Sequence, residues 1–282
     1  SGWILDPDRK KMSKSKGNTV TPIDLLDQYG TDAVRYWAAS ARPGTDTAFS
    51  EDQMKVGRKL ATKLLNVSKF VLGFAEQADA AGEGGVTDPV DAAMLARLDA
   101  TIGEATRALD GFDYARALER TEAFFWWFCD NYVELVKGRA YGIRGEAPAA
   151  SARVALRTAL SAVQRLFAPF LPFATEEAWS WWQAGSVHVA AWPAPGAATY
   201  PPADPAAIDV AVEVLAQVRR AKTEAKVSQR HGVATLHVTA PAEALAALEA
   251  ARGDLLEAGS IAELVSEPAD ELACTITLAP AG

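Results

Sequence analysis

Apolar residues recur at intervals of three and four through most of the sequence, in segments that end at glycine or proline. In residues 50–74 the stripe consists of Leu60, Leu64, Val67, Val71 and Phe74. Because an α-helix makes one turn in about 3.6 residues, this spacing gathers the apolar side chains on one helix face. Helices of this kind bury their stripes by packing against one another. The sequence therefore predicts a mainly α-helical fold.

Three long helices and a short fourth one are expected to form a bundle after this segment. We place the ends of the long helices at Asp110-Gly111, at Gly138 and at Pro169, and the short helix at about 175–183. Their apolar positions are Leu95, Leu98, Ile102, Ala105 and Leu109, then Leu118, Phe125, Phe128, Tyr132 and Val136, then Leu156, Leu160, Val163 and Phe167.

Shorter elements precede the bundle. Trp3-Ile4-Leu5 is a strand fragment at the start of a hairpin, and no earlier segment could pair with it. We interpret this as a sign that the chain is part of a longer protein. Thr21 and Pro22 begin a helix that Gly30 ends, and Thr31 or Asp32 is expected to cap the next helix.

The chain changes character after the bundle. A helix is expected from about 208 to 230. Residues 234–238 and 274–278 then alternate between apolar and polar around a helix near 242–252, which predicts a small β-α-β unit. Residues 80–87 read as a Gly/Ala linker, and residues 185–205 hold five of the fifteen prolines.

The composition excludes several classes of protein. Charged residues interrupt every apolar run before it reaches the roughly 18 residues of a membrane span, and they occupy the region where a signal peptide would be apolar. Cys129 and Cys274 cannot build a disulfide framework or a zinc site, and the three histidines lack the spacing of metal ligands. We expect a cytoplasmic protein, monomeric, with no membrane association and no zinc or other metal site.

Basic residues concentrate at the front of the chain. Residues 1–70 contain 12 lysines and arginines against 8 acidic residues, although the whole chain has a formal net charge of −8. A protein that binds polyanions needs a basic contact surface and not a basic overall charge. Phosphate chemistry is therefore expected first in this region, with unevenly distributed solvated charge as the alternative.

Residues 11–18, Lys-Met-Ser-Lys-Ser-Lys-Gly-Asn, are expected to form an exposed loop. The lysines supply mobile charges, the serines supply hydroxyl donors, and Gly17 allows close approach of the backbone to a ligand. Asn18 can shape the loop through local hydrogen bonds. Because the segment has no histidine, cysteine or carboxylate, it can stabilise charge that develops on a phosphate but cannot act as base or nucleophile. A merely solvated loop is the alternative.

The string KMSKSKGN resembles the second signature of class I aminoacyl-tRNA synthetases. The segments TPIDLLDQYGTDAVRYWAASARPGTD and KLLNVSKFV are similar to the valine branch of that family, and so are FFWWFCDNYVELVKGRAY (124–141) and LFAPFLPFATEEAW (166–179). The resemblance is good over about 1–192. It implies a signature loop with stem-contact helices in residues 1–80, a helical anticodon-binding bundle in 81–205, and a small α/β domain in 206–282.

The resemblance assigns roles to five loop residues. Lys11 and Lys14 fall on the two lysines of the signature, which contact the ATP phosphates while valine attacks the α-phosphate. Ser13 and Ser15 fall on its serines, and Met12 falls on its packing methionine. The implied substrates are valine, ATP with Mg²⁺ and tRNA(Val), which the enzyme joins through valyl-adenylate.

Two parts of the complete enzyme are not found in this sequence. The three histidines do not form a HIGH-like motif, and no editing signature occurs. The resemblance therefore implies that this chain alone is inactive in both reactions. The sequence also departs from the family at Asp8-Arg9-Lys10, where relatives often have a glycine.

Two basic stretches are expected to contact tRNA phosphates, and a solvated helix face is the alternative for each. The first lies on the helix that joins the loop to the bundle: Lys55, Arg58, Lys59 and Lys63. The second lies on the helix that enters the last domain: Arg219, Arg220, Lys222 and Lys226. The aromatic run from Phe124 to Phe128 could stack on anticodon bases, but helical spacing favours core packing for it.

Two other functions remain open at this stage. The chain could belong to the isoleucine or leucine enzyme, because the amino-acid pocket lies in the half that is not present. ASARPGTDTAFSEDQM resembles the valine branch. The chain could also be a stand-alone tRNA-binding module, but such a module would not need an intact signature loop.

Overall fold

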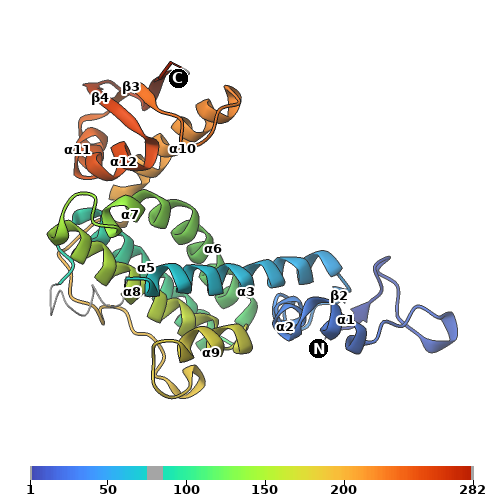
Figure 1. Ribbon diagram of the computed structural model, residues 1–282. Coiled ribbons are helices and arrows are strands. Elements are labelled where there is room, and N and C mark those ends of the chain that lie inside the picture. The colour runs from blue at the N-terminus through green and yellow to red at the C-terminus, as the bar shows by residue number, and fades with distance from the viewer. Residues whose placement is uncertain (1, 75–84, 281–282) are drawn as a thin grey trace. The chain divides into compact units, whose positions relative to one another are not determined.

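The structure, a computed structural model, describes residues 2–74 and 85–280 (Figure 1). Helices predominate, as the sequence predicts, and a small sheet lies near the C-terminus. The chain divides into two compact units. The first unit comprises Ser1–Gly73, Asp99–Phe125 and Ala159–Ala197, and the second comprises Phe74–Leu98, Trp126–Thr158 and Ala198–Gly282. The three predicted domains, 1–80, 81–205 and 206–282, stay a prediction.

The first unit begins with a strand that does have a partner. β1 (Ile4–Leu5) pairs in parallel with β2 (Thr47–Ala48), so that Ile4 lies opposite Thr47. This partner lies more than forty residues later in the chain, so the strand needs no earlier segment to pair with it. Helices α1 (Pro22–Tyr29) and α2 (Thr31–Ala39) fill the interval, and Gly30 joins them with a φ of 88°.

The prediction of one long amphipathic helix, α3 (Glu51–Leu72), is confirmed. The hydroxyl of Ser50 accepts a hydrogen bond from the backbone of Gln53 and caps its first turn. The whole predicted stripe from Leu60 to Phe74 is buried. Gly57 faces Tyr36 of α2 so closely that a Cβ at this position would lie 2.7 Å from the Tyr36 side chain.

The bundle helices occur in the predicted order. They are α5 (Pro89–Asp110), α6 (Tyr114–Trp127), the short π-helical segment η2 (Phe128–Tyr132), α7 (Val133–Ala140), α8 (Glu146–Phe167) and α9 (Pro172–Ser180). Gly138 does not end its helix, contrary to the prediction. It lies inside α7, where the side chain of Glu257 occupies the space that a Cβ would need.

Asp32 does not cap its own helix, because Gly30 is the N-cap of α2. Its carboxylate instead accepts hydrogen bonds from the backbone of Phe173 (3.2 Å) and Ala174 (2.7 Å) in the first turn of α9. A carboxylate at a helix N-terminus satisfies unpaired N–H groups and complements the helix dipole. This contact fixes α2 to α9 within the first unit.

The aromatic run packs as the helical spacing predicts. Phe124, Phe125 and Phe128 are buried, and the ring of Phe125 meets that of Phe167 edge to face. Trp127 is partly buried, and the guanidinium of Arg97 lies 4.2 Å from its ring centre. The phenylalanines of this run are therefore core, and Trp126 and Trp127 are partly buried, so the run does not offer a row of exposed rings for base stacking.

A buried charge network holds the second unit together. The side chain of Arg139 is fully buried and donates hydrogen bonds to the carboxylates of Asp91 and Asp254. Asp91 also accepts from the hydroxyls of Tyr132 and Ser151, both at 2.7 Å. Buried charges are tolerated when they are paired and hydrogen-bonded in this way. No local sequence pattern marks Arg139 as part of such a network.

The C-terminal part of the second unit is a mixed three-stranded sheet with order β4-β3-β5. Its elements are α10 (Asp209–Glu224), β3 (Val233–Ala240), α11 (Ala242–Ala250), α12 (Arg252–Gly259), β4 (Ile261–Pro268) and β5 (Ala273–Leu278). Both predicted strands exist, but they are antiparallel neighbours. The parallel partner of β3 is β4, which the β-α-β prediction missed.

Connecting segments complete the fold. Residues 80–84 of the predicted linker lie outside the described residues. The Pro-rich segment contains the short turns η3 (Val187–Val189) and the start of η4 (Pro205–Ile208). No helix in the described part of the chain is long and apolar enough to cross a membrane.

Candidate functional site

The signature segment lies between β1 and α1 and begins as a narrow hairpin. Leu5 and Lys11 form an antiparallel bridge, and the backbone N–H of Arg9 donates to the carbonyl of Asp6 inside the turn. Arg9 has a φ of 61°, in the left-handed region that favours glycine. A residue with a side chain therefore holds a glycine-type conformation here, at the turn where the resemblance leads us to expect a glycine.

Asp6 and Asn18 tie the two ends of the segment together. The carboxylate of Asp6 accepts from the backbone N–H of Lys10 (2.7 Å) and from the side-chain amide of Asn18 (2.8 Å). The amide oxygen of Asn18 accepts in turn from the backbone N–H of Ser13 at 2.9 Å. The prediction that Asn18 shapes the loop is confirmed, and Asp6 shares this role.

Hydrogen bonds also affect the ionisation of Asp6. The backbone N–H of Lys10, and after it the amide of Asn18, hold the pKa of Asp6 below its usual value of 3.8. The carboxylate is therefore ionised at neutral pH. It remains an acceptor for both ends of the segment throughout the physiological range.

The lysines of the signature face solvent. Lys14 is exposed in the short 3₁₀ turn η1 (Lys14–Lys16), which Gly17 ends with a φ of 66°. The ammonium of Lys11 lies 4.7 Å from the centre of the Trp3 ring, a distance at which cation and ring attract. Ser13 and Ser15 share a hydroxyl–hydroxyl hydrogen bond of 3.2 Å, and Met12 is half-buried.

Hydrogen bonds at the base of the loop restrict its mobility more than the sequence predicts. The sequence predicts a mobile segment over residues 9–18, because nothing in it was expected to offset the loss of backbone entropy. The hydrogen bonds of Asp6 and Asn18 provide such an offset at the base of the loop. We now expect mobility only at the tip, in residues 14–16. The arrangement offers exposed ammonium groups on a fixed base, which suits electrostatic stabilisation of a bound phosphate.

The predicted basic surface on α3 is mostly exposed. Lys55 pairs with Asp52 at 2.9 Å on the surface, and this carboxylate raises the pKa of Lys55. Lys59 is exposed and Lys63 is half-buried, one helical turn apart. Arg58 donates to the carbonyl of Gln28 at 3.1 Å and therefore also connects α3 to α1.

The second basic stretch divides into exposed and buried residues. Arg220 and Lys226 are exposed, and Arg219 is half-buried with a hydrogen bond to the carbonyl of Asp130. Lys222 is only 1% exposed, and its ammonium donates to the carbonyls of Gln229 (3.0 Å) and Gly259 (2.7 Å). Burial lowers the pKa of Lys222. The prediction that Lys222 contacts tRNA was wrong, because its side chain is buried inside the second unit and hydrogen-bonded there.

Metal-ligating groups do not cluster in the described residues. Among these, no three histidine, cysteine, aspartate or glutamate side chains are arranged to hold an ion. His237 lies on β3 beside Glu267, and the ring of His231 contacts the carbonyl of Ala279.

Comparison with known proteins places this geometry in a family. Residues 91–238, more than half of the chain, match the family described as the anticodon-binding domain of tRNA ligase. The chain belongs to this family. Residues 1–50, which carry the signature loop, match the class I tRNA synthetases for isoleucine, leucine, methionine and valine. The predicted class of synthetase and its anticodon-binding bundle are both confirmed.

Individual tRNA ligases show which branch the chain resembles. The valine–tRNA ligase of Thermobifida fusca is 55% identical over 285 residues, a match that covers 100% of this chain and 32% of the relative. That of Leifsonia xyli is 56% identical over 268 residues and covers 94% and 31%. The predicted resemblance to the valine branch is confirmed. The chain spans about a third of the length of these relatives.

A solved structure supports the fold. The agnB2 LeuRS of Agrobacterium radiobacter K84, in a ternary complex with tRNA and LeuAMS, superposes with a TM-score of 0.53. The match covers 96% of this chain and 32% of that one, at 15% sequence identity. At this identity the likeness concerns the fold alone.

Proposed function

We propose that this chain is the part of a valine–tRNA ligase that carries the second signature loop and the tRNA-binding region. The complete enzyme would join valine to tRNA(Val) in an ATP-dependent reaction through valyl-adenylate. One observation carries the proposal. Similarity to valine–tRNA ligases runs along the whole chain, and it includes an intact Lys-Met-Ser-Lys-Ser segment whose lysines are exposed on a fixed base.

The loop would act during formation of the adenylate. The carboxylate of valine attacks the α-phosphate of ATP, and the bond to the leaving pyrophosphate breaks. Negative charge shifts onto the β- and γ-phosphates in this step. Lys11 and Lys14 would meet that charge together with Mg²⁺, which accompanies ATP as part of the substrate. Fixed charges aimed at developing charge lower the barrier without costly rearrangement.

Basic residues that are exposed or half-buried would bind the tRNA. Lys55, Lys59 and Lys63 recur every four residues along α3, so they lie along one side of the helix. Arg219, Arg220 and Lys226 would add phosphate contacts near the end of α10, whereas buried Lys222 is excluded from this set. Contacts of this kind weaken with added salt, because each releases counterions from the nucleic acid.

The proposal extends to where and how the enzyme works. We infer a cytoplasmic monomer that acts in protein synthesis. Because neither a HIGH-like motif nor an editing signature occurs in the sequence, the chain alone should bind tRNA but should neither activate valine nor edit.

Aminoacylation tests the proposal. The complete enzyme that contains this chain should charge tRNA(Val) with valine in preference to isoleucine and leucine, and the chain alone should charge nothing. Preferential charging with isoleucine or leucine would assign the chain to that branch. A complete protein that binds tRNA but charges no amino acid would identify a stand-alone binding module.

Binding of tRNA to the isolated chain tests the second half of the proposal. Reversal of Lys55, Lys59 and Lys63 to Glu should remove most of the affinity at low salt, as measured in a gel-shift assay. Lys137→Glu is the control, because Lys137 is exposed on α7 and belongs to neither basic stretch. Equal affinity of the triple variant and the control would return α3 to the solvated-face interpretation.

A further inference from the structure

Trp3 is an exposed aromatic residue directly before β1. The residue is 62% exposed, so the hydrophobic core does not account for it. Its backbone is nevertheless fixed. The N–H of Trp3 donates to the carboxylate of Asp46 at 2.7 Å, and its carbonyl accepts from the N–H of Thr47 at 2.9 Å. The ring therefore has a defined place on the surface, beside the signature segment.

The hairpin places Trp3 next to the first lysine of the signature. Leu5 and Lys11 lie opposite each other in an antiparallel bridge, and Trp3 precedes Leu5 by two residues. Because side chains alternate along a strand, Trp3 and Lys11 share one face as a diagonal cross-strand pair, at a separation that a long side chain spans. The ammonium of Lys11 accordingly lies 4.7 Å from the centre of the Trp3 ring.

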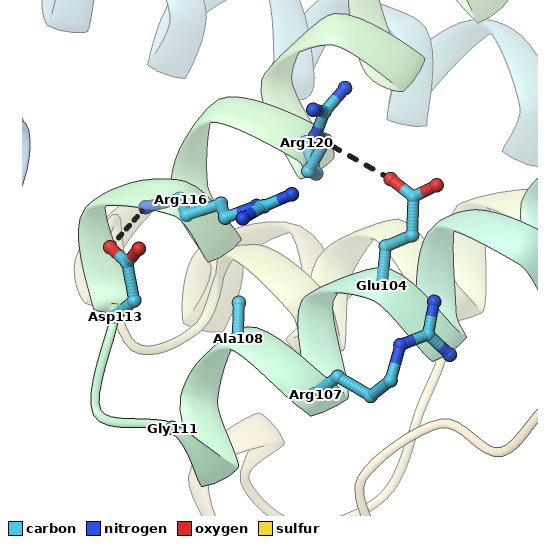
Figure 2. Close-up of a pocket in the computed structure, with 7 residues that line it drawn as sticks. All are labelled: Glu104, Arg107, Ala108, Gly111, Asp113, Arg116 and Arg120. Carbon is cyan, nitrogen blue, oxygen red and sulfur yellow. Dashed lines mark hydrogen bonds and ion pairs between the residues drawn. The ribbon is translucent and has the colours of Figure 1, made fainter.

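An aromatic ring holds a basic side chain in a different way from a carboxylate. In the pocket between α5 and α6, Arg120 lies 3.5 Å from Glu104, a carboxylate that offsets its charge (Figure 2). The face of a ring attracts a cation but carries no net charge. Lys11 pairs with no carboxylate in the described part of the chain, whereas its neighbour Lys10 lies 3.6 Å from Asp8. The ammonium of Lys11 is therefore held in place with its full charge available to a phosphate.

The two signature lysines differ in how they are held. Lys11 lies at the base of the loop, in the hairpin that Asp6 and Asn18 fix. Lys14 lies at the tip, exposed in η1. A long side chain that is already held in place loses less conformational freedom when a ligand binds. Lys11 therefore meets its ligand as a preorganised charge, and Lys14 as a mobile one.

We propose that Trp3 is a positioning residue for adenylate formation, because its ring holds the ammonium of Lys11 where it meets the charge that develops on the phosphates of ATP. Preorganised charges lower a barrier because they need no rearrangement during the reaction. The inference rests on the proposed function, which assigns Lys11 to the ATP phosphates. It adds a residue outside the Lys-Met-Ser-Lys-Ser string that acts through the first lysine.

Pyrophosphate exchange in the complete enzyme that contains this chain tests the effect on the reaction. Trp3→Leu should lower the rate constant of exchange about two- to fivefold, the effect of losing an exposed cation–π contact. KM for valine should stay unchanged, since the charge that Lys11 meets grows in the transition state. An unchanged or faster rate in Trp3→Leu would overturn the proposal.

Two further variants distinguish the ring from its bulk and its surroundings. Trp3→Phe should retain more of the exchange rate than Trp3→Leu, because a phenyl ring still attracts the ammonium and a leucine side chain does not. Trp181→Leu is the matched control, since the ring of Trp181 lies 5.7 Å from the ammonium of Lys69, outside the signature. It should leave exchange unchanged. Equal losses in the phenylalanine and leucine variants of Trp3 would overturn the proposal.

A double-mutant cycle shows whether Trp3 acts through Lys11. Lys11→Ala should lower the rate of exchange more than Trp3→Leu does, because it removes the charge itself. Trp3→Leu added to Lys11→Ala should then cause no further loss. A loss of the same size in both backgrounds would show that Trp3 only supports the hairpin, and would overturn the proposal.

The outcomes separate this inference from the proposed function. An unmodified enzyme without valine-dependent exchange would contradict the proposed function itself. Full activity of Lys11→Ala would overturn the role of Lys11 and, with it, that of Trp3. If the unmodified enzyme is active and Lys11→Ala impairs it, but Trp3→Leu does not, only the role of Trp3 fails.

Discussion

The carboxylate of Asp6 accepts a hydrogen bond of 2.8 Å from the side-chain amide of Asn18, and this contact joins the two ends of the signature segment. The same carboxylate accepts from the backbone of Lys10, and Asn18 accepts from the backbone of Ser13. The base of the loop is therefore fixed by residues outside the Lys-Met-Ser-Lys-Ser string. The lysines at its tip remain exposed.

Replacement of Asp6 by Asn should loosen the loop without unfolding the protein. Lys10 and Asn18 donate to different oxygens of the Asp6 carboxylate, and an amide has only one oxygen, so in the variant one of the two donors would face an NH₂ group. Backbone amide exchange at Lys10 and Ser13 should accelerate about tenfold, as expected for loss of a charge-assisted hydrogen bond. Asp8→Asn is the matched control, because Asp8 is exposed and its carboxylate lies 3.6 Å from the ammonium of Lys10. The same acceleration in both variants would refute the role of Asp6.

The pH dependence of this contact follows from the lowered pKa of Asp6. In the unfolded chain the carboxylate titrates near 3.8, and in the folded chain it titrates below that value. Its stabilising effect is therefore present above pH 3.8 and is lost only as the pH falls through the lower, folded-state pKa. Once corrected for intrinsic exchange rates, protection of the Lys10 amide should stay constant between about pH 5 and 8.

Arg9→Gly should stabilise the turn before the signature. Arg9 holds a φ of 61°, where a side chain costs about 1–3 kcal/mol. Glycine removes this strain but also increases the entropy of the unfolded chain, a loss of about 0.5–1 kcal/mol. Protection of the Lys10 amide should therefore rise several-fold. Arg9→Ala keeps a Cβ and removes the charge, so it should give no gain. A gain with alanine would assign the effect to charge instead of backbone strain.

Arg139→Ala should destabilise the second unit severely. Burial alone would lower the pKa of Arg139, but its hydrogen bond to Asp91 and the nearby carboxylates raise it, so the guanidinium stays charged. Its removal leaves Asp91 and Asp254 buried without a partner of comparable strength. Loss of one member of a buried ion pair costs about 3–5 kcal/mol, measurable by urea unfolding. Arg144→Ala is the control, since Arg144 also pairs with Asp254 but is 32% exposed. An equal cost for both variants would contradict the network.

The helices could be predicted from local sequence patterns. The exceptions are elements that depend on contacts with distant parts of the chain. The cap at Ser50 and the stripe from Leu60 to Phe74 can both be recognised from residues close together in the sequence. They predict α3 correctly. Glycine often ends a helix, so the sequence predicts an end at Gly138, yet packing against Glu257 requires a small residue inside the helix. Strand β4 was missed because its two buried residues, Ile261 and Leu264, are three apart and do not alternate.

Parts of the candidate site needed the structure in the same way. The signature lysines could be found by resemblance, but the bond from Asp6 to Asn18 depends on a hairpin geometry that no local pattern reveals. Lys222 could have been placed correctly. It continues the buried stripe of Val214, Leu215 and Val218 along α10, and the periodicity that identified other helix faces applies to it.

Valine-dependent exchange of pyrophosphate into ATP, measured in the complete enzyme that contains this chain, tests the central claim most directly. Lys14→Ala should reduce the exchange rate about 100-fold and leave the affinity for valine nearly unchanged, because the charge that Lys14 meets grows in the transition state. Lys16→Ala is the matched control, since Lys16 is exposed in the same turn but lies outside the signature. The account predicts a large loss for Lys14 and a small one for Lys16. Exchange that is unchanged in Lys14→Ala would contradict the role of the loop in phosphate chemistry.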